Sequence, residues 1–339
     1  MLTTPRSWPD LTPEWMTTAL APLYPGVRVA TVTPLGRGEG TNARATIGLT
    51  YAAGAGPAQV FVKREGRWIN RLALTALRAR DAEVLLAGSG LDLPLESPRF
   101  LAAARDPRRL ANVVVLEDVT LRGGVPQAMT SPLTPELAAA GLGQLARLHA
   151  AYWSQPIPVA IRPWRQGPVW GPVAAAGFAD AHLRLARLGR RELIVDTPTA
   201  LSRGFLGWAD IAGSGPQTLL HGDPHLANTY LLPDGTVGFY DWQLVRRGSW
   251  VHDVGYFLVS VLSPADRRAH ERDLLAGYLR ELASTDRKAS TDEAWQLYRR
   301  TPVFGLGSWL QTLAGGGFQP SDVCLAAIER FAAAYVDLK

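Results

Sequence analysis

Strand-like patterns are concentrated in the first 120 residues of this 339-residue chain, and helix-like patterns occupy the remainder. Short apolar runs, alternating or continuous and bounded by turn residues, predict strands at residues 27–31, 43–51, 58–63, 98–103 and 112–116. Short connections join the first three, which favours an antiparallel meander. Because strands and helices are segregated, we predict an α+β fold of two lobes, residues 1–119 and 120–339, with the junction at about 117–126.

Apolar residues at helical spacing predict helices in both lobes. In the first lobe, Thr12 and Pro13 are typical of an N-cap and a first helical position, so a short helix is expected over 12–20, and a longer one over 68–87. In the second lobe, helices are expected at residues 134–153, 174–189, 251–262, 264–283, 290–300 and 320–337. The stretch 229–242 is an exception, because two apolar runs flank Pro-Asp-Gly and predict a β-hairpin.

The segment LLHGDPHLANTYLL at 219–232, followed by VGFYDWQ, carries the clearest chemical pattern. Gly222 and Pro224 disfavour a regular helix, so we expect a loop that leads into a strand. Asp223, Asn228 and Asp241 are the polar residues of interest here. Phosphoryl transfer requires such a set, because one carboxylate deprotonates the attacking hydroxyl while an amide oxygen and a second carboxylate hold Mg²⁺. The alternative is that both Asp residues cap turns and Asn228 occupies a bend.

HGDPHLAN and YDWQ resemble the catalytic loop and the metal-binding segment of the aminoglycoside phosphotransferase superfamily. These proteins are small-molecule kinases with a protein-kinase-like fold, and they include choline kinases and ecdysteroid-kinase-like proteins. The resemblance, which extends from about residue 30 to about residue 260, implies a small lobe with a five-stranded antiparallel sheet and a helix, and a larger helical lobe that binds the substrate. It also implies that Asp223 is the catalytic base, that Asn228 and Asp241 bind Mg²⁺, and that His221 orders the loop.

Lysine is rare in this chain, since only three of its 35 Lys and Arg residues are lysines and Lys63 is the only one before Lys288. The resemblance requires a lysine on the third strand to hold the α- and β-phosphates of ATP, and Lys63 ends the third predicted strand. An arginine fork does not readily replace a compact ammonium on a phosphate. A carboxylate on the following helix is expected to pair with Lys63, either Glu83 or, because the helix phase is open by a residue or two, Asp81.

Three glycines in the pattern GxGxG follow the first predicted strand. The resemblance implies a glycine-rich turn over the phosphates here, because glycine lets the backbone approach a nucleotide closely. The pattern differs from the protein-kinase GxGxxG, and loop flexibility would account for the glycines equally well. The residues assigned to this turn are Gly36, Gly38, Gly40, Thr41 and Asn42.

The run VVVLEDVT at 113–120 is the candidate segment for contact with the adenine ring. By the resemblance, backbone groups of Glu117 and Val119 would meet the base. Glu117 and Asp118 also fit an ordinary turn, so both interpretations stay open at this point.

Three further residues lie beyond the main motif. Asp253 is assigned to ordering the catalytic loop, as an equivalent Asp does in related kinases, or to capping a helix. Arg246 and Arg247 either steer a phosphate or an anionic substrate, or form a solvated pair on a loop.

Other functional classes fit the sequence poorly. His221 and His225 are four residues apart, but Gly222 and Pro224 remove the helix that a metal pair would need. No lysine follows a glycine, as a P-loop requires, and no GxSxG elbow occurs. The net charge of +5 is spread evenly, which does not favour a nucleic-acid partner.

Three sequence features bear on the cellular compartment. The first residues lack a basic-then-apolar signal pattern, and the longest uncharged run, at 301–321, is too polar to span a membrane. The single cysteine, Cys324, cannot form an internal disulfide. We therefore expect a cytoplasmic protein that does not act at a membrane.

These observations predict an ATP- and Mg²⁺-dependent O-phosphotransferase that acts on a hydroxylated small molecule. Residues 120–339 carry 21 Lys and Arg against 19 Asp and Glu, whereas a pocket for a strongly cationic aminoglycoside would concentrate acids. An antibiotic or other natural product with few positive charges is therefore the expected acceptor. The alternatives are a metabolic kinase of a choline-like, sugar, nucleoside or steroid-like alcohol, and a catalytically silent nucleotide-binding protein. The sequence indicates neither the substrate-binding residues nor the oligomeric state.

Overall fold

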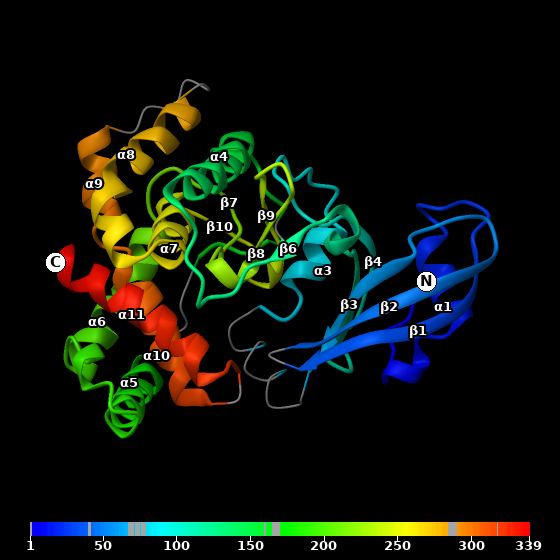
Figure 1. Cartoon of the computed structure of the whole chain (residues 1–339), viewed down its shortest axis with the longest axis horizontal. Coiled ribbons are helices and arrows are strands. Elements are labelled where there is room, and N and C mark those ends of the chain that lie inside the picture. The colour runs from blue at the N-terminus through cyan, green and yellow to red at the C-terminus, as the bar shows by residue number, and fades with distance from the viewer. Residues whose placement is uncertain are drawn as a thin grey trace. The chain divides into compact units, whose positions relative to one another are not determined.

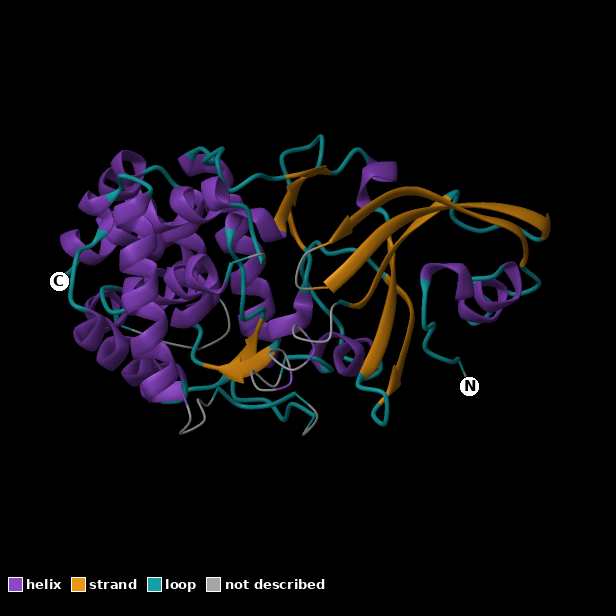
Figure 2. Ribbon diagram, turned by 90° about the horizontal axis from the view of Figure 1, so that it is seen from below, coloured by secondary structure: helices purple, strands orange, loops and turns teal. Residues whose placement is uncertain are grey.

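The computed structural model describes residues 2–39, 42–66, 71, 75, 79–158, 161–164, 170–283, 290–316 and 318–339. The chain divides into two units, whose elements are labelled in Figure 1. The unit that we call the sheet unit comprises Met1–Asp92, Ser97–Val125 and Asp241–Val245. The other, the helical unit, comprises Leu93–Glu96, Pro126–Tyr240 and Arg246–Lys339. Figure 2 distinguishes the helices from the strands by colour, and the predicted α+β class is confirmed.

The sheet unit contains a five-stranded antiparallel sheet with the strand order β1-β2-β3-β5-β4. All five strands begin close to the predicted positions, but β1 ends eight residues later than predicted, and β2 is slightly longer than predicted. Their bounds are β1 (Arg28–Glu39), β2 (Asn42–Ala53), β3 (Gln59–Glu65), β4 (Phe100–Asp106) and β5 (Ala111–Glu117). The expected meander of the first three strands is therefore present, and β5 rather than β4 is the neighbour of β3.

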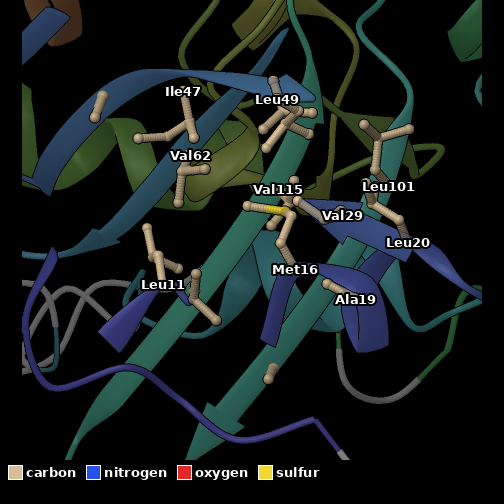
Figure 3. Close-up of a cluster of buried hydrophobic side chains, with 14 of the residues drawn as sticks. Leu11, Met16, Ala19, Leu20, Val29, Ile47, Leu49, Val62, Leu101 and Val115 are labelled. Atoms are coloured by element: carbon tan, nitrogen blue, oxygen red, sulfur yellow. The ribbon is translucent and has the colours of Figure 1, made fainter. Parts of the chain in front are cut away.

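Helix α1 (Pro13–Leu20) covers one face of this sheet, as the close-up in Figure 3 shows. Thr12 caps the helix by accepting a hydrogen bond from the Trp15 backbone N–H, and Pro13 occupies the first helical position, as predicted. Met16 and Leu20 pack with Val62, Val115 and other strand residues in a continuous apolar core. Because side chains alternate along a strand, the residues between these core positions point to the opposite face.

That opposite face of the sheet packs against α3 (Ala82–Ala87). Val84 of α3 contacts Val114 and Leu116 of β5, and Phe61 of β3 joins the same cluster. The alternation on β3 therefore also places Lys63 on the side of α3. Of the helix expected at 68–87, residues 68–70, 72–74 and 76–78 lie outside the described residues. Residues 80 and 81 form a turn, so the expected single helix is interrupted there, and α3 is its final part.

The helical unit is built around α7 (Val251–Val261), all of whose residues are buried. Helices α4, α8, α9, α10 and α11 pack against it. The helices of this unit are α4 (Pro135–Tyr152), α5 (Trp170–Arg187), α6 (Pro198–Ala212), α8 (Pro264–Ala283), α9 (Thr291–Tyr298), α10 (Pro302–Gly315) and α11 (Ser321–Asp337). Within the described ranges, no helix combines the length and the apolar composition needed to cross a bilayer.

Two of these helices, α6 and α10, were not predicted. Helix α6 has an ordinary start signal, because Thr197 accepts a hydrogen bond from the Ala200 backbone N–H. Helix α10 contains several glycines, which lower helix propensity. A Cβ atom at Gly305 would collide with the Phe331 ring, and one at Gly307 would collide with Phe205. Close packing of neighbouring helices thus stabilises a segment whose local propensity is poor.

The predicted hairpin is present in the helical unit as β8 (Thr229–Leu231) and β9 (Val237–Phe239), which pair antiparallel. Gly235 in its turn has φ of 85°, a conformation that favours glycine. Three further short strands are β6 (Val125–Pro126), β7 (Thr218–Leu220) and β10 (Arg246–Gly248), and β7 and β10 pair antiparallel. The loop that holds Asp223 therefore leaves β7 and leads through a 3-10 turn into β8.

Candidate functional site

Lys63 lies at the centre of a buried cluster of charges in the sheet unit. Its Nζ is 2.6 Å from Glu83 Oε2 and 2.7 Å from Asp241 Oδ1. Lys63 is 7% exposed and Glu83 is 5% exposed. The cluster joins the third strand, helix α3 and the Asp241–Val245 segment, which are far apart in the sequence.

The charges of this cluster hold Lys63 as an ammonium ion. Burial lowers the pKa of Lys63, but the charges of Asp241 and Glu83 outweigh burial and raise this pKa above its usual value. Burial raises the pKa of Glu83, and the Lys63 ammonium opposes that effect. Glu83 uses both oxygens, since Oε1 accepts a hydrogen bond of 3.3 Å from the Trp242 backbone N–H.

The choice between Glu83 and Asp81 is resolved by geometry. Asp81 does not reach Lys63 but binds the neighbouring Arg80, with 2.7 Å between Oδ2 and Nη2. Glu83 is buried on the face of α3 that packs on the sheet, whereas the Asp81 side chain is 22% exposed. Glu83 is therefore the acidic partner of Lys63.

Asp241 occupies an unusual backbone conformation, with φ of 69° and ψ of 65°. Only Leu110 and Ser154 share a positive φ among the described residues other than glycine. Such conformations cost about 1–3 kcal/mol and persist where the surrounding structure enforces them. Here the salt bridge to Lys63 and the hydrogen bond from Trp242 to Glu83 secure the segment on both sides of the Asp241–Trp242 peptide bond.

The glycine-rich segment differs from the expected turn. Strand β1 continues to Glu39, so Gly36 and Gly38 are strand residues, paired with Thr46 and Arg44 of β2. The expectation of a turn over residues 36–42 is wrong for these two glycines, because the backbone ladder between the two strands continues past them. Asn42 is the first residue of β2. Gly40 and Thr41 lie outside the described residues.

Asn42 also makes a contact that the sequence did not reveal. Its Nδ2 donates a hydrogen bond of 2.9 Å to Oε1 of Gln243, within the sheet unit. Gln243 is the last residue of the YDWQ segment, two positions after Asp241. This bond links the start of β2 to the segment that carries Asp241.

The candidate adenine-binding segment combines the end of a strand with a turn. Glu117 ends β5, and its backbone N–H donates to the Arg99 carbonyl at 2.9 Å. Asp118 caps the following 3-10 turn through its side chain. The Val119 carbonyl accepts from the Gly124 N–H at 2.9 Å. The turn interpretation of Asp118 is thus present in the structure, and the contact of Glu117 and Val119 with adenine stays a prediction.

In the helical unit, Asp223 and Asn228 lie next to each other. Asn228 Nδ2 donates to the Asp223 backbone carbonyl at 2.9 Å and to Asp223 Oδ2 at 3.2 Å. The His225 N–H donates to the same carbonyl at 2.8 Å, and the Asn228 N–H donates to the His225 carbonyl at 2.8 Å. Hydrogen bonds within the segment 223–228 therefore fold it into a compact loop.

His221 is fully buried and fixes the loop at two points. Its Nε2 lies 3.1 Å from the Tyr240 carbonyl, and its Nδ1 accepts a hydrogen bond of 3.3 Å from the Asp223 backbone N–H. A neutral imidazole protonated on Nε2 satisfies both contacts. His221 therefore lies against the backbone of the residue assigned as the base.

Asp253, on the first turn of α7, binds the backbone of the same loop. Its Oδ2 accepts from the His221 N–H at 2.7 Å and its Oδ1 accepts from the Gly222 N–H at 3.0 Å. His149 Nε2 lies 3.2 Å from Oδ2. Burial raises the pKa of Asp253, but the hydrogen bond and charge of His149 outweigh burial and lower this pKa below its usual value. The ionised carboxylate thus has both oxygens available to accept from the two backbone N–H groups of the loop.

His252, which precedes Asp253, also binds this loop, and sequence reasoning missed it. His252 Nε2 is 3.0 Å from the Gly222 carbonyl, and His252 Nδ1 accepts from Trp208 Nε1 at 3.1 Å. Burial lowers the pKa of His252 to about 4. The only sequence signal was its position beside Asp253, which alone carries little information.

The surroundings of Asp223 in the helical unit are aromatic and cationic. The Tyr256 hydroxyl hydrogen-bonds the Asp223 side chain, and burial together with the Asp223 charge raises the pKa of Tyr256 well above its usual value. His225 Nε2 lies 3.6 Å from Asp223 Oδ2.

Arg246 is the cation near Asp223. Burial lowers the pKa of Arg246 to about 10, and the Asp223 charge opposes this effect. Its guanidinium carbon lies 4.5 Å from the centroid of the Trp164 ring. Arg246 is therefore a partly buried and stacked cation rather than half of a solvated pair.

The donor types of Asn228 and Asp241 fit Mg²⁺, which prefers oxygen ligands. In the helical unit, Asn228 donates from its amide nitrogen, and no hydrogen bond from the described residues reaches its Oδ1. In the sheet unit, Asp241 presents a carboxylate whose Oδ1 contacts the Lys63 ammonium. Each unit therefore contains one candidate oxygen ligand for such an ion.

Comparison with known proteins assigns the chain to a family. The model of the phosphotransferase enzyme family (APH) matches residues 48–301, three quarters of the sequence. The chain belongs to this family. The resemblance identified from the motifs is thereby confirmed, and the protein is a phosphotransferase of the class that comprises small-molecule kinases. Membership of a kinase-like family implies that ATP is the phosphoryl donor.

Solved structures support the fold of this phosphotransferase. A choline kinase from Cryptosporidium parvum Iowa II is 12% identical, with a TM-score of 0.52 over 91% of this chain and 88% of the other. An ethanolamine kinase from Plasmodium vivax is 11% identical, with a TM-score of 0.52 over 96% and 86%. A choline kinase from Streptococcus pneumoniae is 13% identical, with a TM-score of 0.50 over 96% and 98%. No curated protein sequence matches the phosphotransferase.

Proposed function

We propose that this phosphotransferase moves the γ-phosphoryl group of ATP to a hydroxyl group of a small molecule. The observation that carries the proposal is the buried cluster of Lys63, Glu83 and Asp241 in a member of this family. Burial of an ammonium that is 7% exposed between two carboxylates carries a desolvation cost, whereas the neighbouring side chains Phe61, Val114 and Leu116 on that face of the sheet are apolar. A phosphate-binding role explains why the cluster is present.

In the sheet unit, Lys63 binds the α- and β-phosphates, and Glu83 orients its ammonium. The glycine-containing end of the β1–β2 hairpin lies over the phosphates, with Gly36, Gly38, Gly40, Thr41 and Asn42 as the assigned residues. Backbone groups of Glu117 and Val119 contact the adenine ring. These electrostatic and positioning contacts supply most of the rate enhancement in phosphoryl transfer.

In the helical unit, Asp223 orients the acceptor hydroxyl and takes its proton. The hydroxyl oxygen forms a bond to the γ-phosphorus in line with the breaking bond to the β–γ bridging oxygen, and ADP leaves. His221 and Asp253 hold the loop that carries Asp223. A fixed carboxylate reduces the entropy cost of reaching the reactive geometry.

Asn228 and Asp241 provide the oxygen ligands for Mg²⁺ in this proposal. When bound, the ion neutralises charge on the triphosphate. The Asn228 amide keeps its nitrogen on Asp223 and presents its oxygen as the ligand. Each of these two proposed ligands has polar partners within its own unit: Asp223 for Asn228, and Lys63 for Asp241.

The acceptor that the charges favour is an antibiotic or other hydroxylated natural product with few positive charges. The described neighbours of the Asp223 side chain in the helical unit include Asn228, His225, Tyr256 and Arg246, and none of these four is acidic. A strongly cationic acceptor would meet Arg246 without an acidic counterpart among these neighbours. Choline-like, sugar, nucleoside and steroid-like alcohols are the other acceptors to be tested. We place the reaction in the cytoplasm, where ATP is available.

The test is an ATP-consumption screen of the purified protein with Mg²⁺ over hydroxylated antibiotics, nucleosides, sugars and amino alcohols. Mass spectrometry of the product would then locate the added phosphate. We expect at least one neutral or weakly charged compound to gain one phosphoryl group. Binding of Mg-ATP with no turnover on any compound would instead favour a silent nucleotide-binding protein.

The variant Asp223→Ala tests the assignment of the base. We expect turnover to fall by about two to four orders of magnitude, the usual contribution of a general base, while binding of Mg-ATP stays within about twofold. Turnover near that of the wild type would show that Asp223 is not the base.

A further inference from the structure

We propose that His252 is a positioning residue for Asp223, which it aligns by holding the carbonyl of Gly222. This inference rests on the proposed role of Asp223 as the base. His252 lies on the first turn of α7 and binds the carbonyl of Gly222, the residue that precedes Asp223. Its effect on the reaction would pass through the backbone of the loop.

The peptide group between Gly222 and Asp223 is bound by two imidazole rings. Its carbonyl oxygen lies 3.0 Å from His252 Nε2, and its N–H donates to His221 Nδ1 at 3.3 Å. The preceding peptide N–H, on Gly222, donates to Asp253 Oδ1 at 3.0 Å. The backbone on both sides of the Gly222 Cα is therefore held by side chains.

Side-chain contacts are needed to hold Gly222 in one backbone conformation, because glycine can adopt several. Its φ is 85°, in the left-handed region. Rotation about the Gly222 ψ and the Asp223 φ would swing the Asp223 side chain through space. A bond to the carbonyl between these two torsions selects one direction for the carboxylate.

Trp208 determines which nitrogen of His252 carries the proton that is donated to the Gly222 carbonyl. An indole N–H can only donate, so Trp208 Nε1, at 3.1 Å, requires His252 Nδ1 to be the acceptor. The single proton of the neutral ring is then on Nε2, where it points at Gly222. Burial lowers the pKa of His252 to about 4, so the ring is neutral near pH 7 and this tautomer persists.

Packing fixes the orientation of the ring. His252 is 1% exposed. The Trp164 ring centroid lies 4.0 Å from that of His252 and the Phe304 centroid lies 4.8 Å away. Trp164 also carries the Arg246 guanidinium, 4.5 Å from its centroid. One stack of side chains thus supports both the backbone of Asp223 and the cation near it.

The experiment compares His252→Leu, which removes the donor, with His252→Gln, which can donate from its amide to Gly222 and accept from Trp208. His182→Leu on α5 is the matched control. The measurements are kcat and KM with the acceptor found in the screen, the Kd for the non-hydrolysable analogue AMP-PNP with Mg²⁺, and hydrogen exchange of the amides in residues 219–226.

We expect His252→Leu to lower kcat by roughly 10- to 100-fold, because displacement of a reacting group by about 1 Å has effects of this size. The Kd for AMP-PNP should stay within about twofold, and exchange of the Gly222 and Asp223 amides should rise about tenfold or more. His252→Gln should recover kcat to within about threefold of wild type, and His182→Leu should match wild type. Rescue by Gln separates the hydrogen bond from packing.

Two outcomes would overturn the inference: wild-type kcat and amide exchange in His252→Leu, or equal loss in the Leu and Gln variants. Asp223→Ala separates this failure from failure of the proposed function, because an inactive Asp223→Ala beside a fully active His252→Leu contradicts only the role of His252. If His252→Leu does not fold, Trp208→Phe decides. It should lower kcat roughly three- to tenfold relative to Trp295→Phe, and equal kcat in those two variants would refute the inference.

Discussion

The two units hold their polar residues in opposite ways. In the sheet unit, a charged side chain, Lys63, is held by two other charged side chains at 2.6 and 2.7 Å. In the helical unit, the residues around Asp223 bind mostly its backbone and that of its neighbours. Asp253 accepts from the His221 and Gly222 amides, and His252 donates to the Gly222 carbonyl.

The difference teaches which kind of substitution each region tolerates. A cluster of three ions depends on charge and on size, because each member fills the space between the others and breaking a buried pair leaves a charge without its partner. A loop held through its backbone depends on hydrogen-bond donors and acceptors at fixed places. In the sheet unit, even a substitution that keeps the charge of a side chain but changes its shape should therefore be damaging. In the helical unit, loss of a single hydrogen-bond acceptor or donor should be damaging.

The largest effect is expected for Lys63→Arg, which keeps the charge and changes the shape. A planar guanidinium does not fit between two carboxylates that both contact one ammonium in a site that is 7% exposed. We expect kcat/KM for ATP to fall by about 100-fold or more, measured by steady-state kinetics. The same change at Lys339, whose side chain is 60% exposed, should leave kcat/KM unchanged.

Lys288→Arg is a second control, since it replaces the only other lysine of the chain. Equal activity of the Lys63 variant and both controls would show that charge alone matters in the sheet unit. The contrast between the two units would then disappear.

A smaller effect, on stability, is expected for Asp253→Asn. The amide cannot accept from both the His221 and Gly222 amides as a carboxylate does, so one buried N–H loses its acceptor. We expect the free energy of unfolding at pH 7 to fall by about 1.5–3 kcal/mol, the usual contribution of a hydrogen bond to a charged group. Urea titration of both proteins measures the difference.

This difference should depend on pH in a defined direction. The folded-state pKa of Asp253 is below the 3.8 usual for an aspartate, so the ionised carboxylate favours the folded state at any pH above 3.8. As the pH falls below 3.8 and through the folded-state pKa, the carboxylate is protonated and its contribution is lost. The gap between wild type and Asp253→Asn should therefore be full at pH 6 and smaller at pH 3. A gap that grows at pH 3 would contradict the assignment.

The smallest effect, on KM for ATP, is expected for Glu83→Gln in the sheet unit, and it is compared with the effect of Asp81→Asn. Glu83→Gln keeps the shape but weakens the hold on Lys63, so KM for ATP should rise by roughly tenfold, about 1.4 kcal/mol. Asp81→Asn should change KM by less than about twofold, because Asp81 binds Arg80. Steady-state kinetics with ATP as the varied substrate decides, and equal effects of the two changes would remove Glu83 from the phosphate-binding set.

Much of the fold was predictable because its signals are local. Short apolar runs, alternating or continuous, predicted all five strands of the large sheet, and start signals predicted helices such as α1. Helix α10 was missed because its glycines lower helix propensity, while their value lies in close contact with Phe331 and Phe205. The turn assigned to Gly36 and Gly38 was wrong for a related reason, since pairing with β2 continues through both residues.

The amino-acid sequence by itself determined the family, the α+β class and the residue types of the proposed site, including the single lysine before residue 288. Only the tertiary structure decided that Glu83 rather than Asp81 meets Lys63, that Asp241 closes the same cluster, and that His252 binds Gly222. Motifs are short and contiguous, so they can be read along the chain. Partners separated by 20, 178 or 30 residues depend on helix phase and on packing, which short-range patterns do not specify.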